Sequence, residues 1–233
     1  MGVARYHFNE SYFKIIDSPE KAYWLGLIYA DGTVRDRMGG KPMSSIKLSL
    51  ASSDGYIIER FRDDLNSNHP VHIYASRRPN EQSTSELVLN SKYMCADLER
   101  LGVYPRKSLT LLFPTEEQVP STFMPHFIRG YFDGDGSITH VHHGKFPVIN
   151  ICGTKAFLES MRVWLAAHGV DIHNKLGKRH LDRPHIDAYS FYITSTPLIG
   201  AFFGLVYTDA TRFLTRKRNR FDHFFLEQKP LAA

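Results

Sequence analysis

The sequence predicts an α+β fold made of two pseudo-symmetric halves, each with the element order αββαββα and an antiparallel sheet. Two observations lead to this expectation. A mostly apolar stretch that ends in Asp-Gly occurs twice, as WLGLIYADG at residues 24–32 and as IRGYFDGDG at residues 128–136. A later strand pattern, LVLNS at 87–91 and FYITS at 191–195, repeats at the same spacing of 104 residues. Repetition at a fixed period indicates two copies of one structural unit.

The first half is expected to span residues 18–113 after a lead-in at residues 1–17. Ser18 can cap the first helix, and Pro19 suits its first position. Alternating polar and apolar residues predict the strands, and apolar residues at helical spacing predict the helices. In chain order we expect the motif helix, strands over 33–37 and 45–50 joined by a turn at Gly39-Gly40, a helix from Asp54, strands over 71–75 and 86–90, and a helix over 93–101 that ends at Gly102.

A polar segment bracketed by prolines, residues 114–122, is the expected linker to the second half, residues 123–225. A tail, residues 226–233, follows that half. Pro125 begins the second motif helix. We then expect strands over 137–142 and 146–151, a helix over 154–167 that ends at Gly169, strands over 171–176 and 189–194, a helix over 197–206 and a basic run over 212–220.

Small residues lie four positions apart in both motifs, at Gly26 and Ala30 and again at Gly130 and Gly134. Residues with this spacing share one face of a helix. Small side chains there allow two backbones to approach closely. We therefore expect the two motif helices to pack against each other, each ended by the glycine that follows its last aspartate.

Asp31 and Asp135 are expected in the last turns of these helices, where a carboxylate faces the negative end of the helix dipole. Packing the two helices would also bring the like charges together, which is unfavourable. A cation between or beside them would explain the arrangement. The alternative is an ordinary helix pair that ends in Asp-Gly turns, because Asp-Gly is common in turns.

The composition fits this reading without requiring it. The 233 residues are 42% hydrophobic, which is enough for a substantial core, and the net charge of +5 fits a polyanionic partner. Two cysteines, Cys95 and Cys152, give neither a disulfide framework nor a zinc site and favour a reducing compartment. With no signal core and no apolar run near ~18 residues, we expect no membrane segment.

The motifs LGLIYADG at 25–32 and GYFDGDG at 130–136 resemble the two signature motifs of monomeric LAGLIDADG homing endonucleases, and the resemblance covers roughly residues 18–225. Tyr29 departs from the signature, which has its first aspartate there. The resemblance implies a monomeric, metal-dependent endonuclease whose two four-stranded sheets form a saddle over double-stranded DNA at a long asymmetric site. It also implies Mg²⁺ as the cofactor, with Mn²⁺ as a substitute and Ca²⁺ supporting binding only, and a cytoplasmic, nucleoid-associated or organellar location.

The resemblance also assigns roles to residues. Asp31 and Asp135 would hold the metal with help from the Ala30 and Gly134 carbonyls. Lys107 and Lys217 match the basic residue after the third helix of each half, and Asp54 and Thr154 match a polar position that orders water. We expect DNA contacts from basic residues on the sheets and at their tips, with solvated loops as the alternative for the tips, and from Lys155 in the helix expected over 154–167. These residues are Arg35, Arg37, Lys47, Arg77, Arg78, Lys145, Lys155, Lys178, Arg179 and Arg183.

Three other interpretations are weaker. A non-cleaving DNA-binding regulator or an RNA maturase on the same scaffold would tend to lose a motif acid, and both acids are present. A self-splicing intein would need a starting Cys or Ser and a closing His-Asn, which the sequence lacks. His140, His142 and His143 cluster on a wet strand and turn, but they have no acidic or cysteine partner at the spacing of metal ligands.

Overall fold

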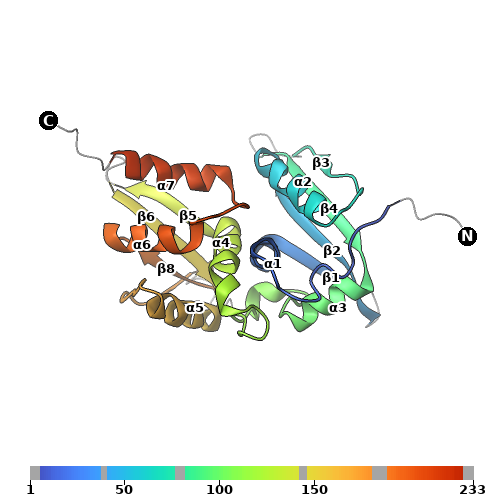
Figure 1. The fold of residues 1–233 in the computed structure, drawn as a ribbon, viewed down its shortest axis with the longest axis horizontal. Coiled ribbons are helices and arrows are strands. Elements are labelled where there is room, and N and C mark those ends of the chain that lie inside the picture. Colours follow the sequence, from blue (N-terminus) through green and yellow to red (C-terminus); the bar gives the residue numbers. More distant parts are fainter. Residues whose placement is uncertain (1–5, 38–40, 77–81, 142–145, 180–187, 228–233) are drawn as a thin grey trace, which may run out of the picture.

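The structure is a computed structural model that describes residues 6–37, 41–76, 82–141, 146–179 and 188–227. It confirms the expected α+β architecture of two halves, each with one antiparallel four-stranded sheet (Figure 1). Strand order is β1-β2-β4-β3 in the first sheet and β5-β6-β8-β7 in the second, so the two halves repeat one topology. None of the helices in these described ranges is long and apolar enough to cross a membrane.

The first half begins with helix α1 and ends with a short 3-10 turn that carries Lys107. Its elements are α1 (Pro19–Asp31), β1 (Gly32–Arg37), β2 (Lys41–Ala51), the 3-10 helix η1 (Ser52–Asp54), α2 (Gly55–Asp64), β3 (His72–Tyr74), β4 (Thr84–Asn90), α3 (Lys92–Arg100) and η2 (Lys107–Leu109). Ser18 caps α1 as expected, because its hydroxyl accepts a hydrogen bond from the Lys21 backbone N–H at 3.2 Å.

The second half repeats this order and adds a basic C-terminal helix. Its elements are η3 (Ser121–Phe123), α4 (Met124–Asp135), β5 (Gly136–Val141), β6 (Phe146–Gly153), α5 (Lys155–Ala167), β7 (Gly177–Lys178), β8 (Tyr189–Ile193), α6 (Thr196–Tyr207) and α7 (Thr215–Glu227). Residues 114–120 precede η3, and the last two residues of the linker expected over 114–122 lie within η3, so the division into halves at this segment stays a prediction.

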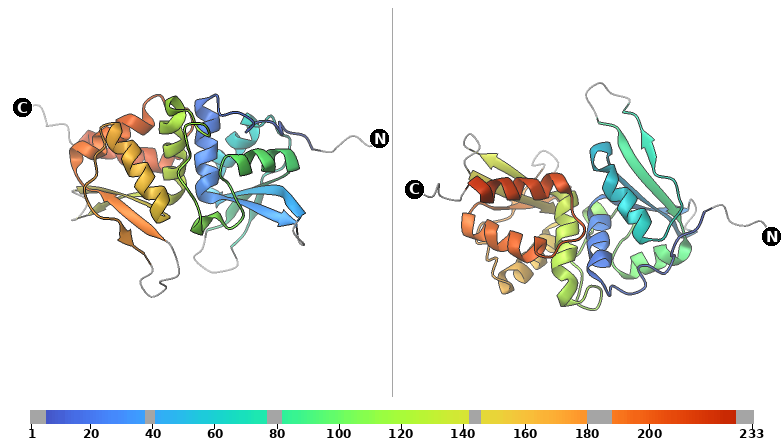
Figure 2. Two further views of the ribbon diagram at one scale, coloured as in Figure 1. Left: turned by 90° about the horizontal axis from the view of Figure 1, so that it is seen from below. Right: turned by 45° about the horizontal axis from the view of Figure 1, so that its top comes forward.

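Helices α1 and α4 pack side by side between the two sheets (Figures 1 and 2). A Cβ atom added to Gly26 would lie 2.0 Å from the Phe127 carbonyl oxygen, and one added to Gly130 would lie 2.0 Å from the Tyr23 carbonyl oxygen. The backbones therefore approach so closely that only glycine fits at these positions. The expected joint between the motif helices is confirmed.

The glycines that end the two motif helices are needed because there is no room for a Cβ atom, and not because the backbone is left-handed. Gly32 and Gly136 have φ values of −73° and −93°, which any residue can adopt. An added Cβ would instead lie 2.7 Å from the Ile28 carbonyl oxygen or 2.1 Å from the Phe132 ring. Each helix therefore passes directly into a strand, so the last aspartate is followed at once by the first residue of β1 or β5.

Each sheet has an apolar face against the helices and a polar face away from them. On β2, Ile46, Leu48 and Leu50 are buried, whereas Lys47 and Ser49 alternate with them on the opposite face. Figure 2 shows the helices on one side of the molecule and the strands of both halves on the other. The two polar faces therefore lie on the same side of the molecule.

The predicted strand over 171–176 is wrong, because the ladder in this region is only β7, Gly177–Lys178. The Asn174 side-chain amide donates to the Tyr192 carbonyl oxygen at 2.6 Å. A side chain therefore takes the acceptor that a neighbouring strand backbone would use. The Arg162 guanidinium also donates to the Ile172 carbonyl oxygen. These bonds hold the segment beside β8 without forming a strand.

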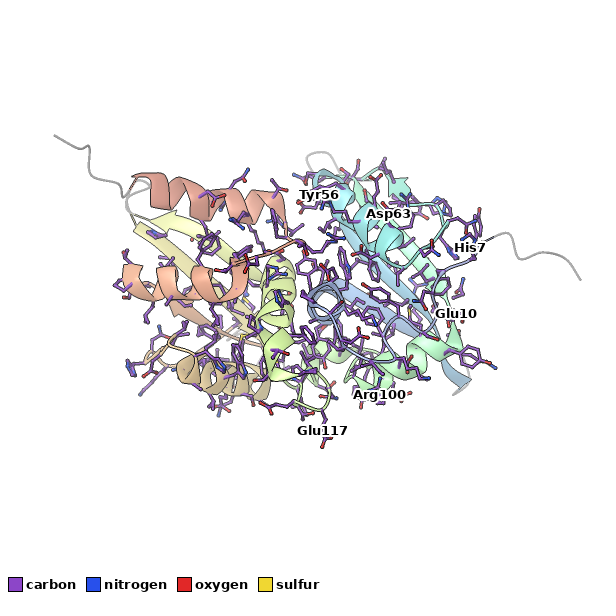
Figure 3. All side chains as sticks on the ribbon, in the orientation of Figure 1. His7, Glu10, Tyr56, Asp63, Arg100 and Glu117 are labelled. Atoms are coloured by element: carbon purple, nitrogen blue, oxygen red, sulfur yellow. The ribbon has the colours of Figure 1, made fainter. Side chains whose placement is uncertain are left out.

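The described part of the lead-in belongs to the first half. Phe13 and Ile16 are buried, the Asn9 backbone N–H donates to the Leu65 carbonyl oxygen at 2.8 Å, and the Arg100 guanidinium donates to the Lys14 carbonyl oxygen at 2.7 Å. Figure 3 places this segment on the side of the first half that faces away from α4. The expected turn at Gly39-Gly40 and residues 77–81, which connect the strands expected over 71–75 and 86–90, lie outside the described residues.

Candidate functional site

Asp31 and Asp135 end α1 and α4 and meet at the joint between the two helices. A Cβ atom added to Gly134 would lie 2.9 Å from a carboxylate oxygen of Asp31 and 2.2 Å from the Ala30 Cβ, so the Asp31 side chain rests on the end of α4. Asp31 is half-buried, and Asp135 is exposed at the surface of the joint. The sequence prediction that these residues come together is therefore fulfilled.

Burial disfavours the charged form of both carboxylates, and the negative charge of Asp135 disfavours that of Asp31 further. Burial, followed by the negative charge of Asp135, raises the pKa of Asp31 to about 6. Burial also raises the pKa of Asp135, although the positive charges of Lys107 and Lys217 oppose that shift. The arrangement is electrostatically costly in the absence of a cation, as the sequence suggested.

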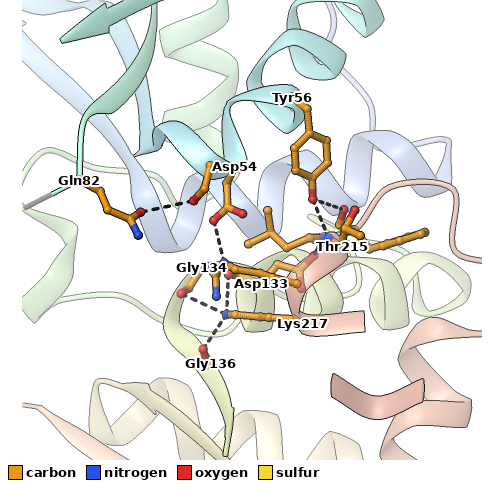
Figure 4. Close-up of polar contacts among 12 residues, drawn as sticks. Asp54, Tyr56, Gln82, Asp133, Gly134, Gly136, Thr215 and Lys217 are labelled. Atoms are coloured by element: carbon orange, nitrogen blue, oxygen red, sulfur yellow. Dashed lines mark hydrogen bonds and ion pairs between the residues drawn. The ribbon is translucent and has the colours of Figure 1, made fainter. Parts of the chain in front are cut away.

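The buried ammonium group of Lys217 binds the C-terminal end of α4. Its Nζ donates to the carbonyl oxygens of Phe132 at 2.5 Å, Asp133 at 2.5 Å and Gly136 at 2.6 Å, and lies 3.5 Å from that of Gly134 (Figure 4). An ammonium group has three donors, so these carbonyls use all of them. The cation also neutralises the negative end of the helix dipole. Burial lowers the pKa of Lys217 to about 8.

Lys107 holds the matching position at the end of α1 with a single contact. Its Nζ donates to the Ala30 carbonyl oxygen at 3.1 Å, and burial lowers its pKa. Arg106 precedes it with a left-handed backbone, φ +58°, which turns the chain toward the joint. The structure therefore places both predicted lysines beside the predicted acids, with one lysine at each helix end.

Asp54 and Thr154 occupy positions with clear structural bonds. The Asp54 carboxylate accepts from Arg216 Nε at 2.8 Å, and Asp54 is buried. The Thr154 hydroxyl caps α5 by accepting from the Phe157 N–H at 3.2 Å and donates to the Leu111 carbonyl oxygen at 2.6 Å. Their expected role in ordering water stays a prediction.

Sequence reasoning missed Asp133, which is fully buried inside the second motif helix. Its carboxylate accepts from the Tyr23 hydroxyl at 2.9 Å, the Tyr207 hydroxyl at 2.8 Å and the Leu214 backbone N–H at 2.7 Å. The corresponding residue of the first motif is Tyr29, whose hydroxyl donates to the Leu101 carbonyl oxygen. An acid on the apolar face of a helix, absent from the other copy, was the available signal.

A cavity lies beside each acid. One of about 190 Å³ adjoins Asp135 and is also lined by Tyr131, Cys152 and Thr154. Another of about 260 Å³ adjoins Asp31 and is also lined by Thr33, Arg106 and Lys107. The two cavities share Ala30 and Ser108 in their linings, so both lie at the joint, one beside each acid.

The expected DNA-contacting residues that the structure describes lie on the first sheet, on or next to β7, and on α5. Arg35 is exposed on the polar face of the first sheet, and Lys47 on that face pairs with Glu86 at 2.9 Å. Lys178 is exposed on β7, and the Arg179 guanidinium contacts the Cys152 sulfur. Lys155 lies on α5, where the helix over 154–167 was expected, with its ammonium group 3.8 Å from Glu159. The side chains of Arg37, His140, Arg77, Arg78, His142, His143, Lys145 and Arg183 lie outside the described residues.

The donor set at the joint suits a hard cation. Within the described ranges, no cluster of three or more His, Cys, Asp or Glu residues can hold a metal ion. The joint offers two carboxylates and the neighbouring carbonyl oxygens of Ala30 and Gly134, which are oxygen donors. Mg²⁺ is commonly held by one or two carboxylates, with water and substrate phosphate oxygens completing its shell.

Comparison with solved structures identifies the fold. The chain matches I-AabMI, a LAGLIDADG meganuclease bound to uncleaved DNA, with a TM-score of 0.56, 9% identity and coverage of 90% of this chain and 91% of that one. It matches the I-LtrWI LAGLIDADG homing endonuclease bound to target DNA with a TM-score of 0.54, 15% identity and coverage of 94% and 90%. It matches I-SmaMI bound to an uncleaved DNA target in the presence of calcium ions with a TM-score of 0.52, 12% identity and coverage of 88% of both chains.

The chain therefore has the LAGLIDADG homing endonuclease fold along nearly its whole length. No protein-family model and no curated protein sequence matches it. The likeness lies in the arrangement of the two halves, since few of the residues are identical.

Proposed function

We propose that the protein is a site-specific endonuclease that hydrolyses both strands of double-stranded DNA with the aid of a divalent metal ion. The observation that carries this proposal is the meeting of Asp31 and Asp135 at the α1–α4 joint, where the Asp31 carboxylate lies against the end of α4 and the negative charge of Asp135 raises its pKa. Each acid is followed directly by the first strand of a sheet. A DNA duplex lying on the two polar sheet faces would therefore have its backbone near both acids.

The metal would be held by the two carboxylates with help from the Ala30 and Gly134 carbonyl oxygens. A divalent metal supplies an acidified water and neutralises charge on a phosphate. Mg²⁺ is the expected ion, with Mn²⁺ as a substitute and Ca²⁺ supporting binding only. The calcium ions named with the similar I-SmaMI structure are consistent with this choice.

The protein residues bind and orient. Asp31 and Asp135 present negative oxygen atoms toward the two cavities. Lys107 and Lys217 place cations within reach of the same region, where positive charge stabilises a phosphate that gains charge during hydrolysis. Lys217 already uses its three donors on backbone carbonyls. Lys217 would therefore contribute a positive charge at a fixed position, and it holds the C-terminal end of α4 in place.

The DNA site is proposed to be long and asymmetric and to be read by a monomer. The polar face of the first sheet carries Arg35, Lys47 and Glu86, whereas the matching face of the second carries Asn150 and Tyr192. Different side chains cannot read identical half-sites equally well. Arg35 and Lys47 also supply the charge that binds phosphates irrespective of sequence.

The test compares Asp31→Asn, Asp135→Asn and a control, Asp97→Asn, whose carboxylate lies 3.8 Å from Arg100 on α3. A duplex selected from a randomised pool by binding in Ca²⁺ is cloned into a plasmid and then incubated with protein and Mg²⁺. We expect wild type and Asp97→Asn to cut both strands, and the two joint variants to bind in Ca²⁺ without cutting. Unimpaired double-strand cleavage by either joint variant would overturn the mechanism. Binding without cleavage by wild type would favour a regulator.

A further inference from the structure

One segment of the second half is bound mainly by side chains of the first half. This segment, residues 211–217, connects α6 to the first turn of α7 and ends at Lys217. We call it the strap. In Figure 4 its residues Thr215 and Lys217 lie beside Asp54 and Tyr56 of the first half and beside the end of α4.

The strap makes its strongest bond to Asp64 at the end of α2. The Arg212 guanidinium donates to both carboxylate oxygens of Asp64, at 2.7 and 2.9 Å. The Trp24 indole N–H also donates to this carboxylate at 2.7 Å, which fixes its orientation. The Arg212 and Asp64 side chains are only 22% and 16% exposed. A two-point, partly buried charge pair of this kind gives geometric precision as well as attraction.

Further bonds from the first half follow along the strap. The Thr211 hydroxyl donates to Glu20 at 2.6 Å. The Tyr56 hydroxyl accepts from the Thr215 backbone N–H at 2.6 Å and donates to the Phe213 carbonyl oxygen at 3.5 Å. The pair between Arg216 and Asp54 completes the set. Bonds at successive residues determine the path of the backbone.

The other side of the strap is bound to α4, next to Lys217. The Asp133 carboxylate accepts from the Leu214 backbone N–H at 2.7 Å, and Arg129 Nε donates to the Arg212 carbonyl oxygen at 2.8 Å. The Lys217 backbone N–H in turn donates to the Leu214 carbonyl oxygen at 3.0 Å. Leu214 thus connects the strap bonds to the lysine that sits at the end of α4.

We infer that Asp64 and Arg212 are positioning residues for Lys217, so that cleavage of one DNA strand depends on a charge pair between the halves. This inference rests on the proposed function. The segment of the first half that carries Lys107, residues 107–111, is held differently. Among the described residues, its one hydrogen bond to the second half is the bond that the Thr154 hydroxyl donates to the Leu111 carbonyl oxygen. Disturbing Asp64 should therefore affect the two strands unequally.

The experiment compares Asp64→Asn with Asp63→Asn, its neighbour on α2. Asp63 pairs only with the adjacent Arg62 among the bonds described, and its side chain is 64% exposed. Both variants lose one negative charge from the same helix, but only the first loses the Arg212 pair. Nicking of each strand is followed separately on a supercoiled plasmid with the selected site, and amide exchange at Leu214 and Thr215 is followed without DNA.

For Asp64→Asn we expect faster exchange at both amides and one strand cut about tenfold more slowly or worse, because small misplacements of reacting groups are costly. The other strand should keep its rate within about twofold, so nicked circles should accumulate. Asp63→Asn should behave as wild type in both measurements. Arg212→Gln removes the same charge pair by changing its other member, and it should give the same unequal slowing of the two strands. It therefore replaces Asp64→Asn in the test if Asp64→Asn does not fold.

Two results would overturn the inference: equal slowing of both strands in folded Asp64→Asn and Arg212→Gln, or unchanged exchange at Leu214 and Thr215. Failure of the proposed function is a different result. In that case wild type would cut neither strand, whereas the exchange measurement would still report whether Asp64 holds the strap.

Discussion

The two halves share one topology but hold their lysines by different means. Lys217 makes three short bonds to the end of α4 and is 3% exposed, and the strap that leads to it is tied to the first half. Lys107 is 7% exposed and makes one bond to the end of α1, from a short turn of its own half. The joint between the halves is symmetric, since a Cβ atom added to Gly26 or to Gly130 would lie at the same distance, 2.0 Å, from a carbonyl oxygen of the opposite helix. Symmetry is therefore retained where the backbones meet and lost where side chains reach the site.

The largest effect should come from breaking the symmetric part. Gly26→Ala and Gly130→Ala each place a Cβ 2.0 Å from a carbonyl oxygen, so we expect a loss of unfolding free energy of about 3 kcal/mol or more for either one. Denaturant unfolding measures it. Gly204→Ala on α6 is the control, because a Cβ there meets nothing within 4 Å. It should leave stability unchanged or raise it by up to about 1 kcal/mol. A mild effect at only one of the two joint glycines would show that the joint is not symmetric.

The next effect separates the two lysines. Lys217→Met removes a cation that satisfies buried helix-end carbonyls, so it should cost about 2–3 kcal/mol of unfolding free energy. Lys107→Met should cost about 1 kcal/mol, because one bond is lost. Thermal unfolding without DNA or metal measures both variants. Equal costs would contradict the difference in anchoring that the contacts indicate.

A smaller effect should appear in the pH dependence of stability without divalent metal. The folded-state pKa of Asp31, about 6, exceeds its ordinary value of 3.8, so the folded state binds this proton more tightly than the unfolded state does. The stability that the bound proton gives is fully present below pH 3.8 and is lost as the pH rises through 6. Asp31→Asn should therefore be more stable than wild type at pH 7 by about 1–2 kcal/mol, after allowance for partial solvent exposure. The difference should vanish near pH 4. Denaturant unfolding in EDTA at several pH values measures it, and a constant difference would contradict the shift.

The smallest effect should sharpen the comparison between the two sheet faces. Arg35→Ala should weaken binding to all DNA sequences alike and make the salt dependence shallower by about one counterion. Asn150→Ala should change base preference with the salt slope unchanged, because an amide carries no charge. Binding titrations in Ca²⁺ across roughly 50–200 mM salt measure both slopes. A changed base preference for Arg35→Ala would place that residue in the other class.

Much of the fold could be predicted from the sequence because its determinants are local and repeated. The glycine spacing, the Ser18 cap and the alternation on β2 each identify an element without knowledge of its neighbours. Asp31 and Asp135 could also be paired, because the packing of two small-residue faces follows from the motifs themselves.

The contacts that distinguish the halves could not be predicted in this way. Asp133 is bound by residues from both halves, at Tyr23 and at Leu214, and the sequence does not show that these meet. Asp54 was assigned by its place after a strand, yet its partner Arg216 lies 162 residues away. The strand predicted over 171–176 was wrong for a local reason, because Asn174 interrupts the alternation between Ile172 and Leu176 and its side-chain amide takes the Tyr192 carbonyl oxygen.

The strap also limits how the protein can be recombined. The chain resembles two modules joined by a linker, and an obvious way to build a hybrid is to exchange one module at residues 114–122. The second module, however, would leave behind the four first-half residues that bind the strap, which are Glu20, Asp54, Tyr56 and Asp64. A hybrid that fuses this second half to a foreign first half would need these four side chains grafted into the foreign half, whereas the reverse hybrid would keep the four side chains but lose the strap that they bind.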